Sequence, residues 1–174
     1  MAALNVKRYG DPILRQVAKP VAAVTPEITV LIADMVETMW RQVGIGLAAP
    51  QIGVGLRIFV MDGGKSKARV LVNPEIVDRR GVVLEEEGCL SLPGIFADVE
   101  RSKWVQVTGL DGEGEPVSFE ASDLRAKVIQ HEMDHLNGVL FIDRLTPVMR
   151  ERIKKKIQKE GFAAAPHRRH AFAL

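Results

Sequence analysis

The chain has 174 residues, of which 47% are hydrophobic, so it is long and apolar enough to form one domain with a buried core. Its net charge of +2 at pH 7 gives no general attraction to polyanions, and we expect no specific DNA binding. Cys89 is the one cysteine, which excludes an internal disulfide. No signal-peptide pattern and no membrane-spanning apolar stretch is apparent, which predicts a cytoplasmic protein without membrane contact.

The first predicted helix follows an extended arm. Residues 4–20 contain two prolines around a short apolar group, which indicates extended chain with one helical turn. Thr25 followed by Pro26 is typical of a helix start, because Thr caps free N–H groups and Pro suits the first helical position. Apolar residues then recur at helical spacing, so we predict a helix from Pro26 to about Val43.

A glycine-rich, uncharged stretch comes next, at residues 44–53. Its glycines allow the backbone to approach a ligand closely. A nucleotide-binding loop is not supported, because Ala49 occupies the third glycine position of the G-x-G-x-x-G pattern and no Gly-Lys-Ser/Thr follows.

The middle of the chain is predicted to be mostly strands. We expect strands at residues 56–61, 68–78, 82–87, 99–110 and 116–120. Ser122 or Asp123 can cap a second helix that runs to Leu136, and Gly138 follows as a typical helix stop. Runs of strands flanked by helices, without regular alternation, indicate the α+β class.

The C-terminal part is predicted to hold a basic helix at about 147–159, which ends before Gly161. Residues 162–174 are expected to form a flexible tail. No internal repeat or linker divides the chain, so we predict one catalytic domain over residues 1–161.

The second predicted helix carries an H-E-x-x-H motif. His131 and His135 are four residues apart and therefore point to the same side of a helix, where both imidazoles can bind one metal ion. Glu132 lies beside that site as a candidate base for a metal-activated water. We expect this helix at the centre of the fold, with antiparallel or mixed sheets packed around it.

The third metal ligand decides the chemistry. A common metalloprotease would use a downstream residue, for which Glu151, Glu160, His167 and His170 are the candidates. The alternative is Cys89, which follows a glycine at the end of a predicted strand, and whose thiolate is an excellent ligand for zinc or ferrous iron. The residues favour Cys89, while a zinc endopeptidase with a downstream ligand stays open as the alternative function.

Three stretches together resemble the signature motifs of the peptide deformylases. They are GIGLAAPQ at 44–51, EGCLS at 87–91 and QHEMDH at 130–135, in the order usual for that family. The resemblance covers nearly the whole chain. It implies a hydrolase that removes the formyl group from the N-terminal formyl-methionine of nascent polypeptides and releases formate.

The resemblance also implies a role for individual residues. The metal ligands would be Cys89, His131 and His135, and the ion would be Fe(II) physiologically, with zinc, nickel or cobalt as substitutes. A metal-bound water would attack the formyl carbon, with Glu132 as general base and then acid. The implied oxyanion donors are the side chain of Gln51 and the backbone N–H of Leu90.

Further residues are candidates for binding the peptide. Ile45 and Gly46 on one side and Gly88 on the other can pair with its backbone like an added strand. Leu124 and Val128 precede His131 at helical spacing and can line an apolar slot for the methionine side chain, although plain core packing explains them equally well.

Two surface features remain. Arg101 is a candidate ion-pair partner for one carboxylate of the acidic run at residues 85–87. The basic helix at 147–159 is the part that contacts the ribosome in some relatives, and attraction to RNA phosphates would suit its charge, but a merely solvated helix is an equal alternative.

Overall fold

The computed structural model describes residues 3–162, and these form an α+β domain with two antiparallel sheets. The larger sheet has the strand order β1-β2-β3-β6-β7, and the smaller one pairs β4 with β5. The strands are β1 (Gly46–Ala48), β2 (Ile58–Gly64), β3 (Lys67–Arg80), β4 (Val83–Cys89), β5 (Leu92–Arg101), β6 (Trp104–Leu110) and β7 (Pro116–Ser122). The α+β prediction is confirmed.

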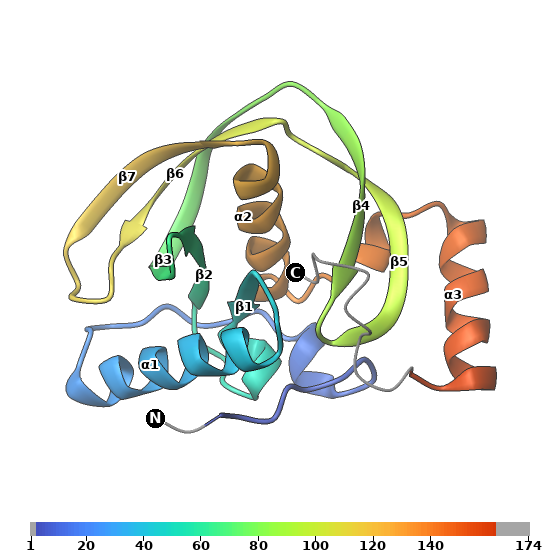
Figure 1. Ribbon diagram of the computed structural model, residues 1–174, viewed down its shortest axis with the longest axis horizontal. Coiled ribbons are helices and arrows are strands. Elements are labelled where there is room, and N and C mark those ends of the chain that lie inside the picture. Colours follow the sequence, from blue (N-terminus) through green and yellow to red (C-terminus); the bar gives the residue numbers. More distant parts are fainter. Residues whose placement is uncertain (1–2, 163–174) are drawn as a thin grey trace.

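Helix α2 (Asp123–Leu136) lies between the two sheets (Figure 1). The chain passes over one end of this helix twice, from β3 to β4 and back from β5 to β6. Its apolar residues, among them Val128, Ile129 and Met133, pack on Phe59 and other residues of the five-stranded sheet. The two-stranded sheet covers the opposite side. Every residue of α2 from 126 to 136 is therefore buried, including the polar ones, and each buried polar side chain needs a partner.

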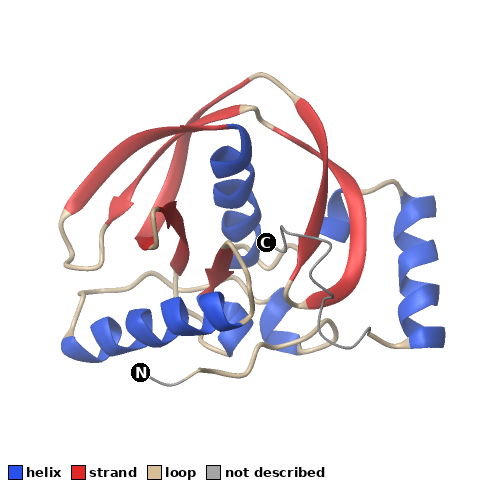
Figure 2. Ribbon diagram, in the orientation of Figure 1, coloured by secondary structure: helices blue, strands red, loops and turns tan. Residues whose placement is uncertain are grey.

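Helix α1 (Pro26–Arg41) lies at the surface, along one side of the domain (Figure 2). Its predicted start is confirmed, since the Thr25 hydroxyl accepts a hydrogen bond from the Ile28 N–H. The predicted end at Val43 is two residues too late. Val43 has a φ of 57°, outside the range of a right-handed helix, and the chain turns there toward β1.

The strand prediction is wrong in one region. Residues 99–110 were expected to form one strand, but they contain the end of β5, a turn and the whole of β6. β5 pairs with β4, whereas β6 pairs with β3 and β7, so this stretch supplies both sheets. Strand β1 and most of β5 were not predicted, because β1 has three residues and β5 begins in a segment with proline and glycine.

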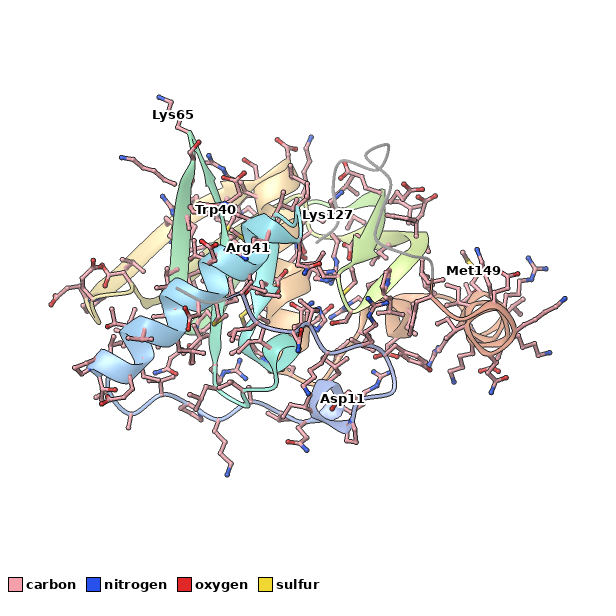
Figure 3. All side chains as sticks on the ribbon, turned by 60° about the horizontal axis from the view of Figure 1, so that its bottom comes forward. Asp11, Trp40, Arg41, Lys65, Lys127 and Met149 are labelled. Carbon is pink, nitrogen blue, oxygen red and sulfur yellow. The ribbon has the colours of Figure 1, made fainter. Side chains whose placement is uncertain are left out.

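The C-terminal helix α3 (Pro147–Glu160) follows a short 3-10 helix at Phe141–Arg144 and agrees with its prediction. Figure 3 shows α3 nearly end on at one side of the molecule, with Met149 in its first turn. Ile153 and Ile157 attach it to the core. The predicted flexible tail lies outside the described residues, apart from Phe162. Within residues 3–162, the structure has no helix with the length and apolar character needed to cross a membrane.

Candidate metal centre

Cys89, His131 and His135 meet at the centre of the domain. The Cys89 Sγ lies 3.3 Å from Nε2 of His135, which in turn lies 3.2 Å from Nε2 of His131. All three side chains are buried. Among the described residues this is the group of His, Cys, Asp and Glu side chains whose donor atoms are close enough to share one ion, within 4.8 Å of one another.

Local structure explains how the three donors are placed. The two histidines are one turn apart on α2, with ring centroids 4.9 Å apart. Cys89 is the last residue of β4, where the chain turns into β5, so its side chain points out of the small sheet toward α2. The Ser91 N–H, 3.4 Å from Sγ, holds this turn.

The charge states of the donors suit a cation. Burial lowers the pKa of the His135 imidazole well below its ordinary value, so the ring is neutral and keeps a lone pair for an ion. Burial raises the pKa of the Cys89 thiol to about 12, so this thiol becomes a thiolate only when a cation faces it. One thiolate and two neutral imidazoles are a donor set typical of zinc and ferrous iron, and the residues present therefore fit a divalent ion.

Glu87 orients the His131 ring through Nδ1, the ring nitrogen that does not face the other two donors. Its carboxylate accepts a hydrogen bond from Nδ1 of His131 at 2.9 Å, which leaves Nε2 facing Cys89 and His135. Burial alone would raise the pKa of Glu87, but hydrogen bonds from Arg101 and His131 outweigh it and lower that pKa to about 2. Arg101 bonds both oxygens of Glu87, at 2.7 and 2.9 Å, so the expected pairing of Arg101 with this acidic run is confirmed.

Arg101 also connects the site to the other side of α2. Its third bond, of 2.7 Å, goes to Asp134, which Arg144 binds from the opposite direction. Of these contacts the sequence predicted only the pairing of Arg101 with the acidic run. The bonds of Glu87 to His131 and of Arg101 to Asp134 were not predicted. Asp134 is a variable position of the H-E-x-x-H pattern, and nothing in that pattern assigns it a partner.

Glu132 is buried beside the three donors, and neither of its carboxylate oxygens has a hydrogen-bond partner among residues 3–162. Burial raises the pKa of this carboxyl well above its ordinary value, and the negative charge of Glu87 raises it further. Such a carboxyl can hold a proton and release it when a cation or a base comes near. Gly46 of β1 packs directly against it, and a side chain on Gly46 would collide with this carboxyl.

Gln51 lies on the other side of Cys89. Its Oε1 accepts a hydrogen bond from the Ala48 N–H at 2.8 Å, which fixes the amide so that Nε2 points toward Cys89 Sγ, 3.6 Å away, and the Ser91 hydroxyl, 3.2 Å away. The side chain of Leu90 covers Gly44, whose added Cβ would lie 2.8 Å from Leu90 Cδ1. The structure thus brings both predicted oxyanion donors to the turn that holds Cys89.

The predicted peptide-binding residues lie in three places. Gly46, Ile45 and Val128 lie together, with Val128 Cγ1 3.0 Å from the position of a Cβ on Gly46. Val128 is also fully packed into the main core, whereas Leu124 is 38% exposed and lies on the outer part of α2. Gly88 is covered by the ring of Phe96.

A cavity of about 300 Å³ opens beside Cys89. The walls include Leu90 of the β4–β5 turn and Leu92 and Phe96 of β5, and the N-terminal arm contributes Asn5 and Arg8. The sequence carries no signal for these arm residues, because an extended arm has no periodicity that shows which side faces a site. Of the alternative ligands, Glu151 and Glu160 are exposed on α3, while His167 and His170 lie outside the described residues.

Comparisons with known proteins place the chain in one family. The sequence model of a family described as "Polypeptide deformylase" matches residues 3–151. A peptide deformylase of Alkalilimnicola ehrlichii is 50% identical over 162 residues, which cover 91% of each chain. The crystal structure of a peptide deformylase from Legionella pneumophila superimposes with a TM-score of 0.86 at 44% identity, over 91% of this chain and 95% of that one. A Synechococcus elongatus peptide deformylase in complex with actinonin gives a TM-score of 0.85 at 39% identity, over 100% and 92% of the two chains.

Proposed function

The chain belongs to the polypeptide deformylase family, and we propose that Cys89, His131, His135 and Glu132 carry out its reaction. The enzyme is a metal-dependent hydrolase that removes the formyl group from an N-terminal methionine. The observation that carries the site assignment is the convergence of the Cys89 sulfur with both histidine Nε2 atoms. The zinc endopeptidase alternative has no support in these comparisons.

In this proposal Cys89, His131 and His135 hold the ion. When bound, a divalent ion supplies a Lewis acid that polarises the formyl oxygen and lowers the pKa of a water toward neutrality. Glu87 keeps the Nδ1 proton of His131 in place, and Arg101 keeps Glu87 charged. Three protein donors leave room for water and substrate, as hydrolysis requires.

Glu132 moves the proton. Its oxygens have no other partner within the described residues, so they are available to take a proton from the attacking water and to return it to the departing amine. Gln51 donates from Nε2 to the oxygen that gains charge, because its own carbonyl is already held by the Ala48 N–H. The backbone N–H of Leu90 is the second donor, on the same turn as Cys89.

The peptide is proposed to bind along β1. This strand is at the edge of the five-stranded sheet, with β2 as its one partner strand in the described chain, so its outer side can accept an added strand. Ile45 and Gly46 would pair with the peptide on that side, and Gly88 on the other. Leu124 and Val128 would form the wall of the methionine pocket.

Fe(II) is the proposed physiological ion. Thiolate and imidazole donors bind both iron and zinc, so the donor set does not select between them. A ferrous ion beside a thiolate would make the enzyme sensitive to oxygen. Metal analysis of protein purified without air should give about one iron per chain, and a full complement of zinc in its place would refute this assignment.

We propose that residues 1–161 form the catalytic domain. We also propose that the enzyme acts on nascent peptides at the ribosome, in the cytoplasm. The basic helix α3 carries exposed cations, among them Lys155 and Lys156. Replacing both by glutamine should reduce co-sedimentation with ribosomes, whereas the same change at the exposed Lys65 and Lys67 should not. Equal loss in the two variants would mean general charge attraction.

The catalytic assignment is tested by formate release from formyl-Met-Ala-Ser. A Glu132→Gln variant should lose at least about 10²-fold in kcat while it keeps its metal, since general acid–base catalysis contributes about 10²–10⁴-fold. Glu120→Gln, an exposed position on β7, is the matched control and should be as active as the unchanged protein. Cys89→Ala should lose stoichiometric metal, and retained metal in that variant would contradict the proposed ligand set.

A further inference from the structure

A second cavity, of about 320 Å³, lies on a different face of α2 from the metal centre. Gln130 and Asp134 form its floor, each one residue before a metal-facing histidine and therefore rotated by about 100° around the helix. The other walls come from three separate parts of the chain. Besides Gln130 and Asp134, the polar side chains that line it are Arg79, Glu100, Arg101, Ser102 and Arg144.

Two of the three arginines share one carboxylate. Arg101 is 4% exposed and donates to Glu87 and, through Nη1, to Asp134 at 2.7 Å. Arg144 donates to both oxygens of Asp134. Asp134 is 6% exposed and accepts from both guanidinium groups, so its charge is used within the cavity wall. Each guanidinium has five N–H groups, which leaves donors on both arginines unused by these bonds.

The third arginine has no carboxylate partner. Arg79 Nη1 donates to Oε1 of Gln130 at 3.2 Å, and no ion pair involves Arg79 within residues 3–162. The Gln130 amide is fixed, because its Nε2 donates to the carbonyls of Ser102 and Ala126, and its Oε1 also accepts from the Ser102 N–H. A neutral group therefore holds Arg79 in place. The Asp134 carboxylate also attracts Arg79, but it is already bonded to Arg101 and Arg144.

We propose that this arginine cavity is a binding site for a small oxyanion of the phosphate class. Guanidinium groups bind phosphate and similar oxyanions through paired N–H donors, and three of them from β3, β5 and the 3-10 helix converge here. The buried Arg101 and Gln130 make the floor rigid, as a specific site requires. The site does not depend on the proposed catalytic roles.

Besides Asp134, a second carboxylate opposes the anion. Glu100 also lines the cavity, from an exposed position on β5, so water and salt screen its charge more than the charge of the buried Arg101. Removal of the Glu100 charge should therefore strengthen anion binding, whereas removal of the Arg79 charge should weaken it.

The test is a calorimetric titration of the metal-loaded protein with inorganic phosphate, at constant ionic strength kept by sodium chloride. Arg79→Gln should weaken phosphate binding by about tenfold or more, as expected for loss of a charge-assisted hydrogen bond. Arg80→Gln is the matched control, because this neighbouring arginine pairs with Asp78 and lies over Trp104 instead. It should change the affinity less than about twofold.

Glu100→Gln completes the experiment and should bind phosphate more tightly than the unchanged protein. Thermal unfolding of each variant without phosphate shows whether it is folded, and the exposed Glu100 keeps the test decisive if Arg79→Gln is unstable. Equal phosphate affinity in Arg79→Gln and the unchanged protein would place the anion elsewhere, for example at the metal, and overturn the proposal. Absence of binding at millimolar phosphate, or no tightening in Glu100→Gln, would overturn it as well.

Discussion

Replacing Gly46 by alanine should reduce activity about 10²-fold while the protein remains folded. Gly46 has no left-handed φ, so its backbone accepts alanine without strain. The added methyl would lie 3.0 Å from Cδ of Glu132 and 3.0 Å from Cγ1 of Val128, and closer still to Oε1 of Glu132. Val128 is fixed in the core, so the Glu132 carboxyl has to move, by a distance on the order of 1 Å.

The two effects have separate causes. A displacement of about 1 Å at a catalytic group can cost about 10²-fold in rate, and we expect a loss of that size in kcat/KM. Added volume in a packed site costs about 1–3 kcal/mol, and the reduced freedom of the unfolded chain returns about 0.4–1 kcal/mol. The net loss of at most about 2.5 kcal/mol lowers the melting temperature by roughly 5–10 °C for a chain of this size.

Formate release, thermal unfolding and metal content of the same preparation separate these effects. Gly112→Ala is the control, because its added Cβ would lie 3.8 Å from Val70, an ordinary contact far from the site. We expect Gly46→Ala to keep its metal, since it touches no proposed ligand. If Gly46→Ala retains more than about a third of kcat/KM with its metal in place, the position of Glu132 is not what limits the reaction, and the reasoning is refuted.

Two further substitutions test the packing around the site and the helix ends. Arg101→Met should lower the free energy of unfolding by about 3–5 kcal/mol in a urea titration, because the buried Glu87 carboxylate then keeps only His131 as a partner and Asp134 keeps only Arg144; a loss below about 1 kcal/mol would contradict this. Gly138→Ala should lower the melting temperature much more than Gly161→Ala. Both glycines have positive φ, 71° and 67°, but an added Cβ on Gly138 would lie 2.6 Å from the Arg15 carbonyl oxygen, whereas no atom of residues 3–162 lies within 4 Å of one on Gly161; equal melting temperatures would rule out this clash.

The helices were predictable because their signals are local. Thr25 and Thr146 cap α1 and α3 with their hydroxyls, proline follows each of them, and Gly161 ends α3 with a positive φ. Each signal acts within one turn of chain, so it is readable without the rest of the fold. The two-residue error at the end of α1 arises because the chain leaves the helical conformation before Val43 and turns toward β1.

The sheets were less predictable because their partners are far apart in the sequence. Residues 92–98 lack the alternation and β-branched enrichment of an obvious strand, yet they form most of β5 because β4 lies beside them. The expected strand at residues 99–110 has strand-like composition throughout. Only pairing divides it, since its two halves join different sheets.

The sequence by itself determined the family and the H-E-x-x-H helix, and it favoured Cys89 over the downstream candidates as the third ligand, because motif spacing and donor chemistry are carried by single short segments. Only the tertiary structure decided which groups bond to the polar side chains of that helix on the sides that face away from the metal centre. Glu87, Arg101 and Asp134 come from three elements that the fold brings together, and Arg79 and Arg144 join them from two more. A buried polar side chain takes whichever partner the packed fold presents, so its role becomes visible only once the elements are in place.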